Sequence, residues 1–225
     1  MVQTSEQSSG TRQRILKAAG EVFAEKGYRH ATVAEICRLA GANIAAINYH
    51  FGSKETLYAE SWRLAHQAML KASPIDGGVP DEAPAEQRLR GRIRSMLHRA
   101  ISDDGLEFRI MAHEMANPTG LLVQVERDSI GPLAQGTEKI ILELLDGQVD
   151  EPLLRVCVAS VIGPCLQVVR RQQMSRRLGQ SPWFDEKSME VLVEHFATFA
   201  LAGIRETSRR LKERSPATPD RESNP

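Results

Sequence analysis

Four of the six residues in segment 43–48, two asparagines, one isoleucine and one alanine, can each contact the edge of a base pair. An asparagine amide can form a bidentate pair with adenine, and an Ile or Ala side chain can contact the methyl group of thymine. The residues that we expect to face the bases are Asn43, Ile44, Ala45 and Asn48. This set predicts direct readout of a DNA sequence in the major groove.

Four nearby polar side chains suit contacts with DNA phosphates, which position a protein on the duplex without reading its sequence. These residues are Thr32, Tyr49, His50 and Lys54. Residues 11–58 contain seven Lys and Arg against four Asp and Glu, a net charge of +3. The whole chain of 225 residues has 29 of each and a net charge of zero. That balance disfavours a sequence-independent nucleic-acid coat but permits a specific reader with one basic surface.

Two short helices joined by a glycine are predicted to position these side chains. Thr32 and Glu35 have the spacing of a capping box, which begins a helix whose expected inner face is Val33, Ile36 and Leu39. Gly41 ends that helix and permits a sharp turn. This arrangement is typical of a helix-turn-helix, whose second helix enters the major groove.

The second helix of this pair is expected to begin after Asn43, which can cap it, and to run to about Tyr49. Ile47 and Phe51 are one turn apart and are predicted to face the core. Ser53 can cap a fourth, long helix that starts near residue 54. An alternative interpretation is a three-helix cap that binds no ligand.

The remaining chain also has helical rather than strand periodicity, so the predicted fold class is all-α. The first helix is expected to begin at Thr11, to bury Ile15, Ala19, Val22 and Phe23, and to end at Gly27. Segment 74–85 has three prolines and a Gly-Gly pair and is predicted to be a loop. Further helices are expected to stop at Gly105, at 117–118, near 146–147 and at 179–182.

Motifs of catalysis and metal binding are missing from the sequence, which disfavours an enzyme and predicts no cofactor. His113 and Glu114 begin like a zinc-protease helix, but position 117 is Asn instead of the second His. The three cysteines, Cys37, Cys157 and Cys165, have no C-x-x-C spacing and are expected to be reduced and inert. The longest apolar run, 156–166, is shorter than the ~20 residues of a membrane span. We therefore expect a cytoplasmic protein with no membrane contact.

The N-terminal region resembles the DNA-binding domain of TetR-type repressors almost without gaps over about fifty residues. The segments that carry the resemblance are TRQRILKAA at 11–19, FAEKGY at 23–28, Thr32-Val33, Ile36, Ala40-Gly41 and YHFGSKETLY at 49–58. HEMANPT at 113–119 and RVCVASVIG at 155–163 look like the CecR-like C-terminal domain of one branch. The third helix departs from the family's usual Gly, Leu and aromatic residue, with Ala45, Ile47 and Asn48 in these places. The operator sequence therefore cannot be inferred from the family.

The resemblance implies a homodimeric regulator, usually a repressor, that binds double-stranded operator DNA and is released by a small molecule. It also implies an effector site among the C-terminal helices, where Met and aromatic side chains otherwise only fill a core. The residues that we expect around this effector are Phe108, Arg109, Met111, Glu114, Met115, Asn117, Gln167 and Trp183.

Two C-terminal segments, 152–169 and 189–203, are predicted to be helices that form the two-fold interface as a four-helix bundle. Apolar residues surround the first of these helices, so we expect it to be buried on more than one face and kinked at Pro164. Burial within one chain is the alternative explanation.

Four regions are expected along the chain: a disordered tail at 1–10, a DNA-binding domain at 11–58, a ligand-binding and dimerisation domain at 59–213 and a disordered tail at 214–225. The alternative functions are a transcriptional activator of the same family and a helical adaptor that does not bind DNA.

Overall fold

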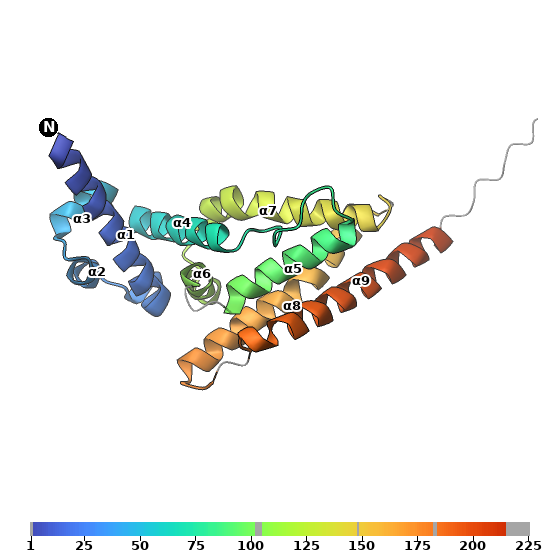
Figure 1. Ribbon diagram of the computed structural model, residues 1–225. Helices are drawn as coiled ribbons and strands as arrows, with labels where there is room; N and C mark the ends of the chain where they lie inside the picture. The colour runs from blue at the N-terminus through green and yellow to red at the C-terminus, as the bar shows by residue number, and fades with distance from the viewer. Residues whose placement is uncertain (1, 102–104, 148, 182–183, 215–225) are drawn as a thin grey trace, which may run out of the picture.

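A computed structural model describes residues 2–101, 105–147, 149–181 and 184–214. Every regular element within these ranges is a helix, which confirms the predicted all-α fold (Figure 1). Residues 215–225 of the tail expected at 214–225 lie outside the described residues, as does Trp183.

The first four helices form one end of the molecule, and the fourth extends from it (Figure 1). Their bounds are Val2–His30 for α1, Val33–Ala40 for α2, Ile44–Phe51 for α3 and Lys54–Ala72 for α4. The expected boundary between residues 58 and 59 falls inside α4. This helix is therefore one continuous connection between the N-terminal helices and the rest of the chain.

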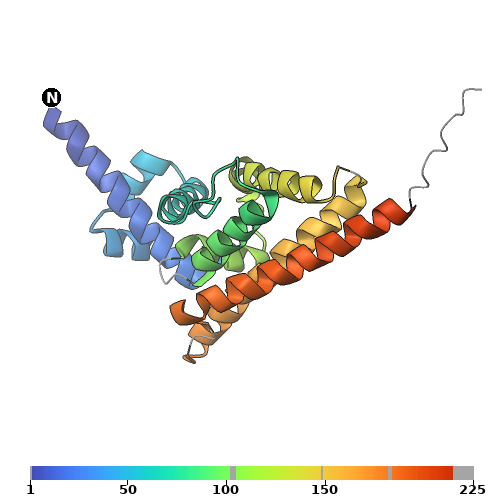
Figure 2. The ribbon, with the colours of Figure 1, turned by 45° about the vertical axis from the view of Figure 1, so that its right-hand side comes forward.

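The remaining helices form a bundle with α5 at its centre (Figure 1). Their bounds are Ala85–Ile101 for α5, Leu106–Ala116 for α6, Val123–Leu144 for α7, Glu151–Arg177 for α8, Glu186–Ser188 for the 3₁₀ helix η1 and Met189–Arg214 for α9. Helix α5 packs against α7, α8 and α9. Figure 2 shows α8 and α9 running side by side along one edge.

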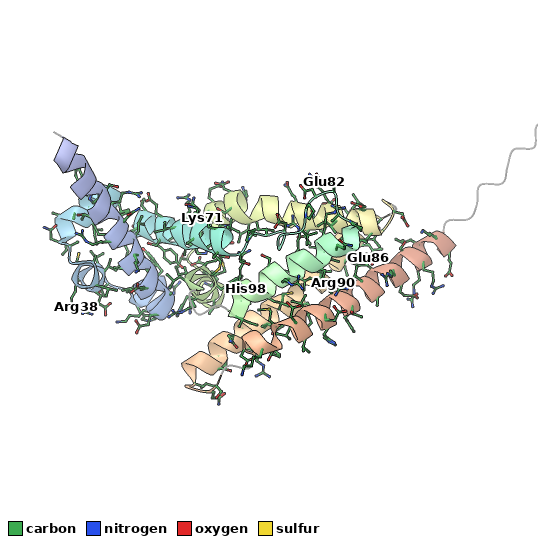
Figure 3. All side chains as sticks on the ribbon, viewed as in Figure 1. Arg38, Lys71, Glu82, Glu86, Arg90 and His98 are labelled. Carbon is green, nitrogen blue, oxygen red and sulfur yellow. The ribbon has the colours of Figure 1, made fainter. Side chains whose placement is uncertain are left out.

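Ion pairs hold α5 to α9 along the side of α5 that carries Glu86 and Arg90 (Figure 3). Arg90 pairs with Glu194, and Glu86 pairs with Arg205. Exposed pairs of this kind each contribute about 0–1 kcal/mol, so the apolar core beneath them supplies most of the stability of this contact.

The capping signals of the helix-turn-helix are confirmed. Thr32 and Glu35 form the reciprocal capping box at the start of α2, and Gly41 closes that helix in the left-handed conformation with φ 59°. The side chains of Asn43 and Ser53 cap α3 and α4 by accepting hydrogen bonds from the amides of Ala46 and Thr56. Local side-chain hydrogen bonds thus set the boundaries of the elements expected to meet DNA.

Two predictions about the N-terminal helices were wrong. Helix α1 begins at Val2 rather than Thr11, so the backbone from Val2 to Gly10 is helical instead of a disordered tail. Leu39 is exposed, because the inner face of α2 is formed by Ile36, Cys37 and Ala40. The three- and four-residue spacing of a helix permits either face, and packing against α1 selects the second.

Helix α8 also differs from its prediction. Pro164 lies inside the helix, and part of the apolar surface of the helix is exposed, with Val156 exposed by 59%. By length and composition, Glu151–Gln172 could cross a membrane, but a core helix of a soluble protein meets the same criteria. The expected burial on more than one face is therefore absent in the single chain.

The buried apolar residues form two cores, and the helices that contribute to each core are not consecutive in the sequence. One core joins α5, α7, α8 and α9. The other contains the N-terminal helices together with Ile110 of α6 and Leu122 and Val125 near the start of α7. Helix α6 is therefore packed into the same core as the helix-turn-helix, although it lies more than fifty residues after it.

Ile47→Ala should destabilise the protein by about 2–4 kcal/mol, because it removes a large side chain from a closed core. Ile47 is 1% exposed, whereas Ile44 on the same helix is 55% exposed. Ile44→Ala is therefore the matched control and should change stability by less than about 0.5 kcal/mol. Urea unfolding followed by circular dichroism measures both. Equal losses would contradict the placement of α3.

Candidate nucleic-acid interface and adjoining cavity

The outer face of α3 presents the side chains expected to read bases. Ile44, Ala45, Asn48 and the capping residue Asn43 are exposed, and Tyr49 is 81% exposed. Ile47 and Phe51 anchor the opposite face in the core. The outward orientation predicted for these residues is confirmed. The exposed surface of this short helix therefore consists of amide, aliphatic and aromatic side chains.

Two of the eight residues predicted to contact DNA also cap helices within the protein. Asn43 Oδ1 accepts a hydrogen bond from the Ala46 amide at 2.9 Å. Thr32 Oγ1 accepts from the Glu35 amide at 3.2 Å and donates to Glu35 Oε2 at 3.0 Å. A variant at either position would therefore weaken a helix cap as well as any contact with DNA.

Three of the four candidate phosphate contacts, Tyr49, His50 and Lys54, lie where α3 ends and α4 begins, whereas Thr32 caps α2. The Lys54 ammonium lies 4.4 Å from the centroid of the Tyr28 ring, and the Tyr28 hydroxyl donates a hydrogen bond to Glu55. Burial lowers the pKa of Lys54, and burial with the Glu55 hydrogen bond raises the pKa of Tyr28 to about 12. The cation–π contact positions the Lys54 charge at the edge of the α3 surface.

Several cations of the basic segment form ion pairs or hydrogen bonds that connect neighbouring helices of the protein. Arg12 pairs with Glu60 of α4 and lies over the Phe51 ring, and Arg14 Nε donates to the Ala40 carbonyl at 3.3 Å. Lys26 pairs with Glu35, and this hydrogen bond is the main reason that the Glu35 pKa is lowered. Glu60 lies outside residues 11–58, so its pair with Arg12 makes the net charge of +3 for that segment an overestimate of the charge available to DNA.

Arg38 remains on the outside of α2, as Figure 3 shows. Its side chain is exposed, and it lies in the last turn of that helix, on the same part of the molecule as α3. Sequence reasoning counted Arg38 only toward net charge. Its exposed position on the first helix of the helix-turn-helix makes it a further candidate phosphate contact.

A cavity of about 870 Å³ lies between α4, α5, α6, α7 and α8. Four of the predicted effector residues line it: Phe108, Met111 and Met115 from α6 and Gln167 from α8. The volume falls in the range of small-molecule sites. The methionine and aromatic stripe of α6 therefore lines an open space instead of only filling a core.

The prediction is corrected for three other residues, since Arg109, Glu114 and Asn117 do not line this cavity. Residues three or four apart share a helix face, and Arg109 and Glu114 occupy other faces of α6. Asn117 follows the last residue of this helix. The amide of Asn117 ends α6 by donating to the His113 carbonyl at 2.9 Å. Trp183, the eighth, lies outside the described residues.

Glu114 instead joins α6 to α4 and to the loop before α7. Tyr58 donates to Glu114 Oε2 at 3.1 Å, and the amides of Thr119 and Gly120 donate to Glu114 Oε1 at 2.8 and 3.0 Å. Burial and the Glu114 carboxylate raise the pKa of Tyr58, so its hydroxyl stays protonated as a donor. This network fixes α6 beside the first two turns of α4.

Helix α6 also contacts the end of α1 closely. Gly27 has φ 71°, and a Cβ atom there would lie 2.9 Å from His113 Nδ1. Only a residue without a side chain permits this backbone conformation and this approach together. Helix α1 was expected to end at Gly27 but continues to His30, with a kink at Gly27 where His113 approaches.

Sequence reasoning missed a buried polar cluster on the cavity wall, formed by His66, Arg99 and Glu107. Arg99 pairs with Glu107 Oε1, and His66 Nδ1 lies 3.0 Å from Glu107 Oε2. The Trp62 ring stacks on His66 with centroids 4.8 Å apart. The only signal in the sequence was the spacing of Trp62 and His66, which places both on one face of α4.

The three cysteines are free and buried. Burial raises the pKa of each thiol, that of Cys165 to about 12. The thiolate is the reactive form, so burial disfavours redox chemistry at these positions.

Two family models match successive parts of the chain. Residues 15–60 match the family of bacterial regulatory proteins called the tetR family. Residues 85–204 match the C-terminal domain of the HTH-type transcriptional dual regulator CecR. The two matches together cover the helix-turn-helix and most of the helical bundle.

Two curated relatives are regulators of transcription. CecR from Shigella flexneri is 28% identical over 196 residues, covering 80% of this chain and 85% of the relative. UidR from Escherichia coli K12 is 34% identical over 111 residues, covering 48% of this chain and 54% of the relative. The second match therefore spans about half of each protein.

Solved structures share the fold at low sequence identity. FadR from Bacillus halodurans, described as a regulator of fatty acid degradation, has a TM-score of 0.64 and 18% identity, covering 85% of this chain and 98% of FadR. AibR, solved with isovaleryl coenzyme A and operator DNA, has a TM-score of 0.65 and 18% identity, covering 84% of this chain and 97% of AibR.

These matches are to transcriptional regulators, so the chain is a DNA-binding regulator rather than an enzyme. With both the N-terminal and C-terminal family models matched in order, the chain belongs to the TetR family of transcriptional regulators, in the branch with a CecR-type C-terminal domain.

Proposed function

We propose that this regulator is a homodimeric repressor that binds a palindromic operator through α3 and is released when a small molecule enters the cavity. The observation that supports the proposal is that one helix, α4, connects the DNA-binding surface to the cavity. This helix begins at Lys54 beside the α3 surface and supplies Trp62 and His66 to the cavity wall.

Exposed apolar stripes on α8 and α9 support the homodimer. On α8 the stripe includes Val156, Ala159, Ser160 and Leu166, and on α9 it includes Val191, Phe199, Ala202 and Gly203. Phe199 is 74% exposed, and a contiguous apolar patch of this kind indicates a protein interface. Pairing both helices with their copies would bury the stripes in a four-helix bundle. The apolar surface of α8 is then explained without a membrane.

A dimer has two α3 helices, and a two-fold axis presents both to one side of the duplex. Successive major grooves on that side are about 34–36 Å apart, so only dimers with this separation can insert both helices. A ligand shifts the protein between two separations only if it binds one more tightly. Coupling of about 1–3 kcal/mol is ordinary for such regulation.

The contacts of α6 provide a second route from the cavity to the DNA-binding helices. Phe108 and Met111 line the cavity, while Ile110 lies in the N-terminal core and Glu114 bonds to Tyr58 of α4. A ligand that moves α6 must therefore also move residues packed against α1 and α4. AibR, which was solved with both a ligand and operator DNA, supports the pairing of these two activities in one fold.

Activation is the second candidate function, because CecR is described as a dual regulator. The same DNA surface and cavity serve both functions. A reporter fused to the promoter distinguishes them: repression predicts higher expression when the regulator gene is deleted, whereas activation predicts lower expression.

Tyr49→Ala and Lys54→Ala should each weaken operator binding about equally for all operator sequences, because phosphate contacts carry no sequence information. Lys54→Ala should also reduce the salt dependence of binding by about one released counterion. Gel-shift titrations of DNA flanking the gene measure both. Lys71→Ala, at the far end of α4 (Figure 3), is the control and should bind normally. Unchanged affinity in both test variants would remove these residues from the interface.

Asn48→Ala should relax the preference at one base position and cost about 1–3 kcal/mol of discrimination there. Asn48 is exposed and is not the cap of α3, so the variant tests readout without loss of a cap. Selection from a randomised operator library measures the preference at every position. A selected sequence identical to that of the parent protein would contradict direct readout by Asn48.

Phe199→Glu should convert the dimer to a monomer of 25.0 kDa, because it places a charge in each copy of the apolar interface. Glu194→Gln alters the ion pair with Arg90 on the neighbouring part of α9 and should remain a dimer. Light scattering after gel filtration measures the mass. A parent protein that is monomeric at micromolar concentration, or a Phe199→Glu protein that is still dimeric, would contradict the proposed interface.

A further inference from the structure

The charged side chains on the cavity wall are predominantly positive. The lining contains three guanidinium groups, from Arg92, Arg99 and Arg170, and one carboxylate, from Glu107. Arg99 already pairs with Glu107, so this carboxylate is compensated inside the wall. A cationic ligand would therefore meet two further guanidinium groups without a second carboxylate among the described lining residues.

Several buried polar atoms on the cavity wall have no hydrogen-bond partner within the described part of the protein. They are Nε1 of Trp62, Nδ1 and Nε2 of His66, Nε of Arg99 and Oε2 of Glu107. Glu107 Oε2 lies 3.0 Å from His66 Nδ1, whereas Trp62 Nε1 and Arg99 Nε can only donate. A buried donor without a partner is unfavourable, so an acceptor oxygen of a ligand would stabilise these two groups.

Arg92 adds positive charge to the same wall. Its Nη1 lies 3.4 Å from Thr137 Oγ1, and its side chain is half-buried between α5 and α7. Burial lowers the pKa of Arg92 more than Asp76 and Asp81 raise it. An anion in the cavity would offset this loss of hydration, and the planar guanidinium is suited to a carboxylate.

The rest of the wall is apolar. Phe108, Met111 and Met115 of α6 face Leu89 and Ile93 of α5 and Val161 of α8 across the cavity. Unbranched methionine side chains adapt to ligands of different shape. A ligand that fills this space must therefore carry a large hydrophobic body in addition to its polar group.

We propose that the effector is an amphipathic monocarboxylate, with its carboxylate among Trp62, Arg92 and Arg99 and its apolar body along α6 and α8. This inference rests on the proposed function, because it names the ligand class of the same cavity. Tight packing of the apolar body supplies affinity, and the carboxylate determines which ligands are accepted.

Three ten-carbon probes test the charge requirement with a constant apolar body: decanoate, decanol and decylamine. The chain has two tryptophans, so Trp183→Phe leaves Trp62 on the cavity wall as the single fluorescent reporter. We expect decanoate to change the Trp62 emission and to bind at least tenfold more tightly than decanol, with no binding of decylamine. Equal binding of decanoate and decanol, or tighter binding of decylamine, would overturn the proposal.

Variants of α5 test the position of the carboxylate. Arg92→Met should weaken decanoate binding about tenfold or more and leave decanol unchanged, whereas Arg92→Lys, which keeps the charge, should lose less. Arg90→Met is the matched control, because Arg90 pairs with Glu194 on the α9 side and does not line the cavity (Figure 3). Equal decanoate affinity in Arg92→Met and Arg90→Met, with both proteins folded by circular dichroism, would contradict the assignment.

All ligand binding is measured without DNA, so this inference and the proposed function fail separately. If decanoate does not bind while the protein still binds its operator, the ligand class is wrong and the DNA-binding role stands. If decanoate binds as expected but does not release the operator, the ligand class stands and the proposed release is contradicted.

Discussion

The packing of α6 against the N-terminal core is the constraint on which the rest of the structure depends. Ile110 is fully buried with the helix-turn-helix residues, while Phe108 and Met111, on neighbouring turns, line the cavity. Side chains one to three residues apart on one helix cannot move independently over large distances. The cavity and the DNA-binding helices therefore share a wall, and no separate linker is needed to connect them.

The buried cluster beside that wall has a cost that a purely structural role does not explain. Burying charged groups is unfavourable even when they are paired, and apolar residues of similar size often stabilise a core better. Here Arg99, Glu107 and His66 connect α5, α6 and α4 at the cavity. Because the cluster joins three helices at the ligand space, binding there would change how these helices pack. The incomplete hydrogen bonding of the cluster is consistent with a site that is completed by a ligand.

Local signals made the helix-turn-helix predictable from the sequence. Thr32, Gly41, Asn43 and Ser53 each act within four residues of their own position, so their effects on the backbone can be inferred without tertiary structure. The outward face of α3 followed from the same spacing, since Ile47 and Phe51 fix which side is buried. The error at Leu39 arose because two faces of α2 fit the apolar pattern and only the position of α1 decides between them.

The effector site could be predicted only in part. The stripe of Phe108, Met111 and Met115 is periodic and was found, whereas Glu114 was assigned to the cavity although it bonds to Tyr58. Trp62 and His66 were missed because they lie on α4, whereas the effector site was expected among the C-terminal helices. Contacts among α4, α5 and α6 join residues up to 56 positions apart, and helical periodicity contains no information about such pairs.

Hydrogen–deuterium exchange of the free and operator-bound protein tests the shared wall most directly, because it reports local opening segment by segment. The account predicts slower exchange on operator binding in α3, and also in residues 106–116 of α6, which lie away from the DNA-reading surface. Protection confined to α2 and α3, with exchange in α6 unchanged, would contradict the claim that the cavity and the DNA interface are mechanically one unit.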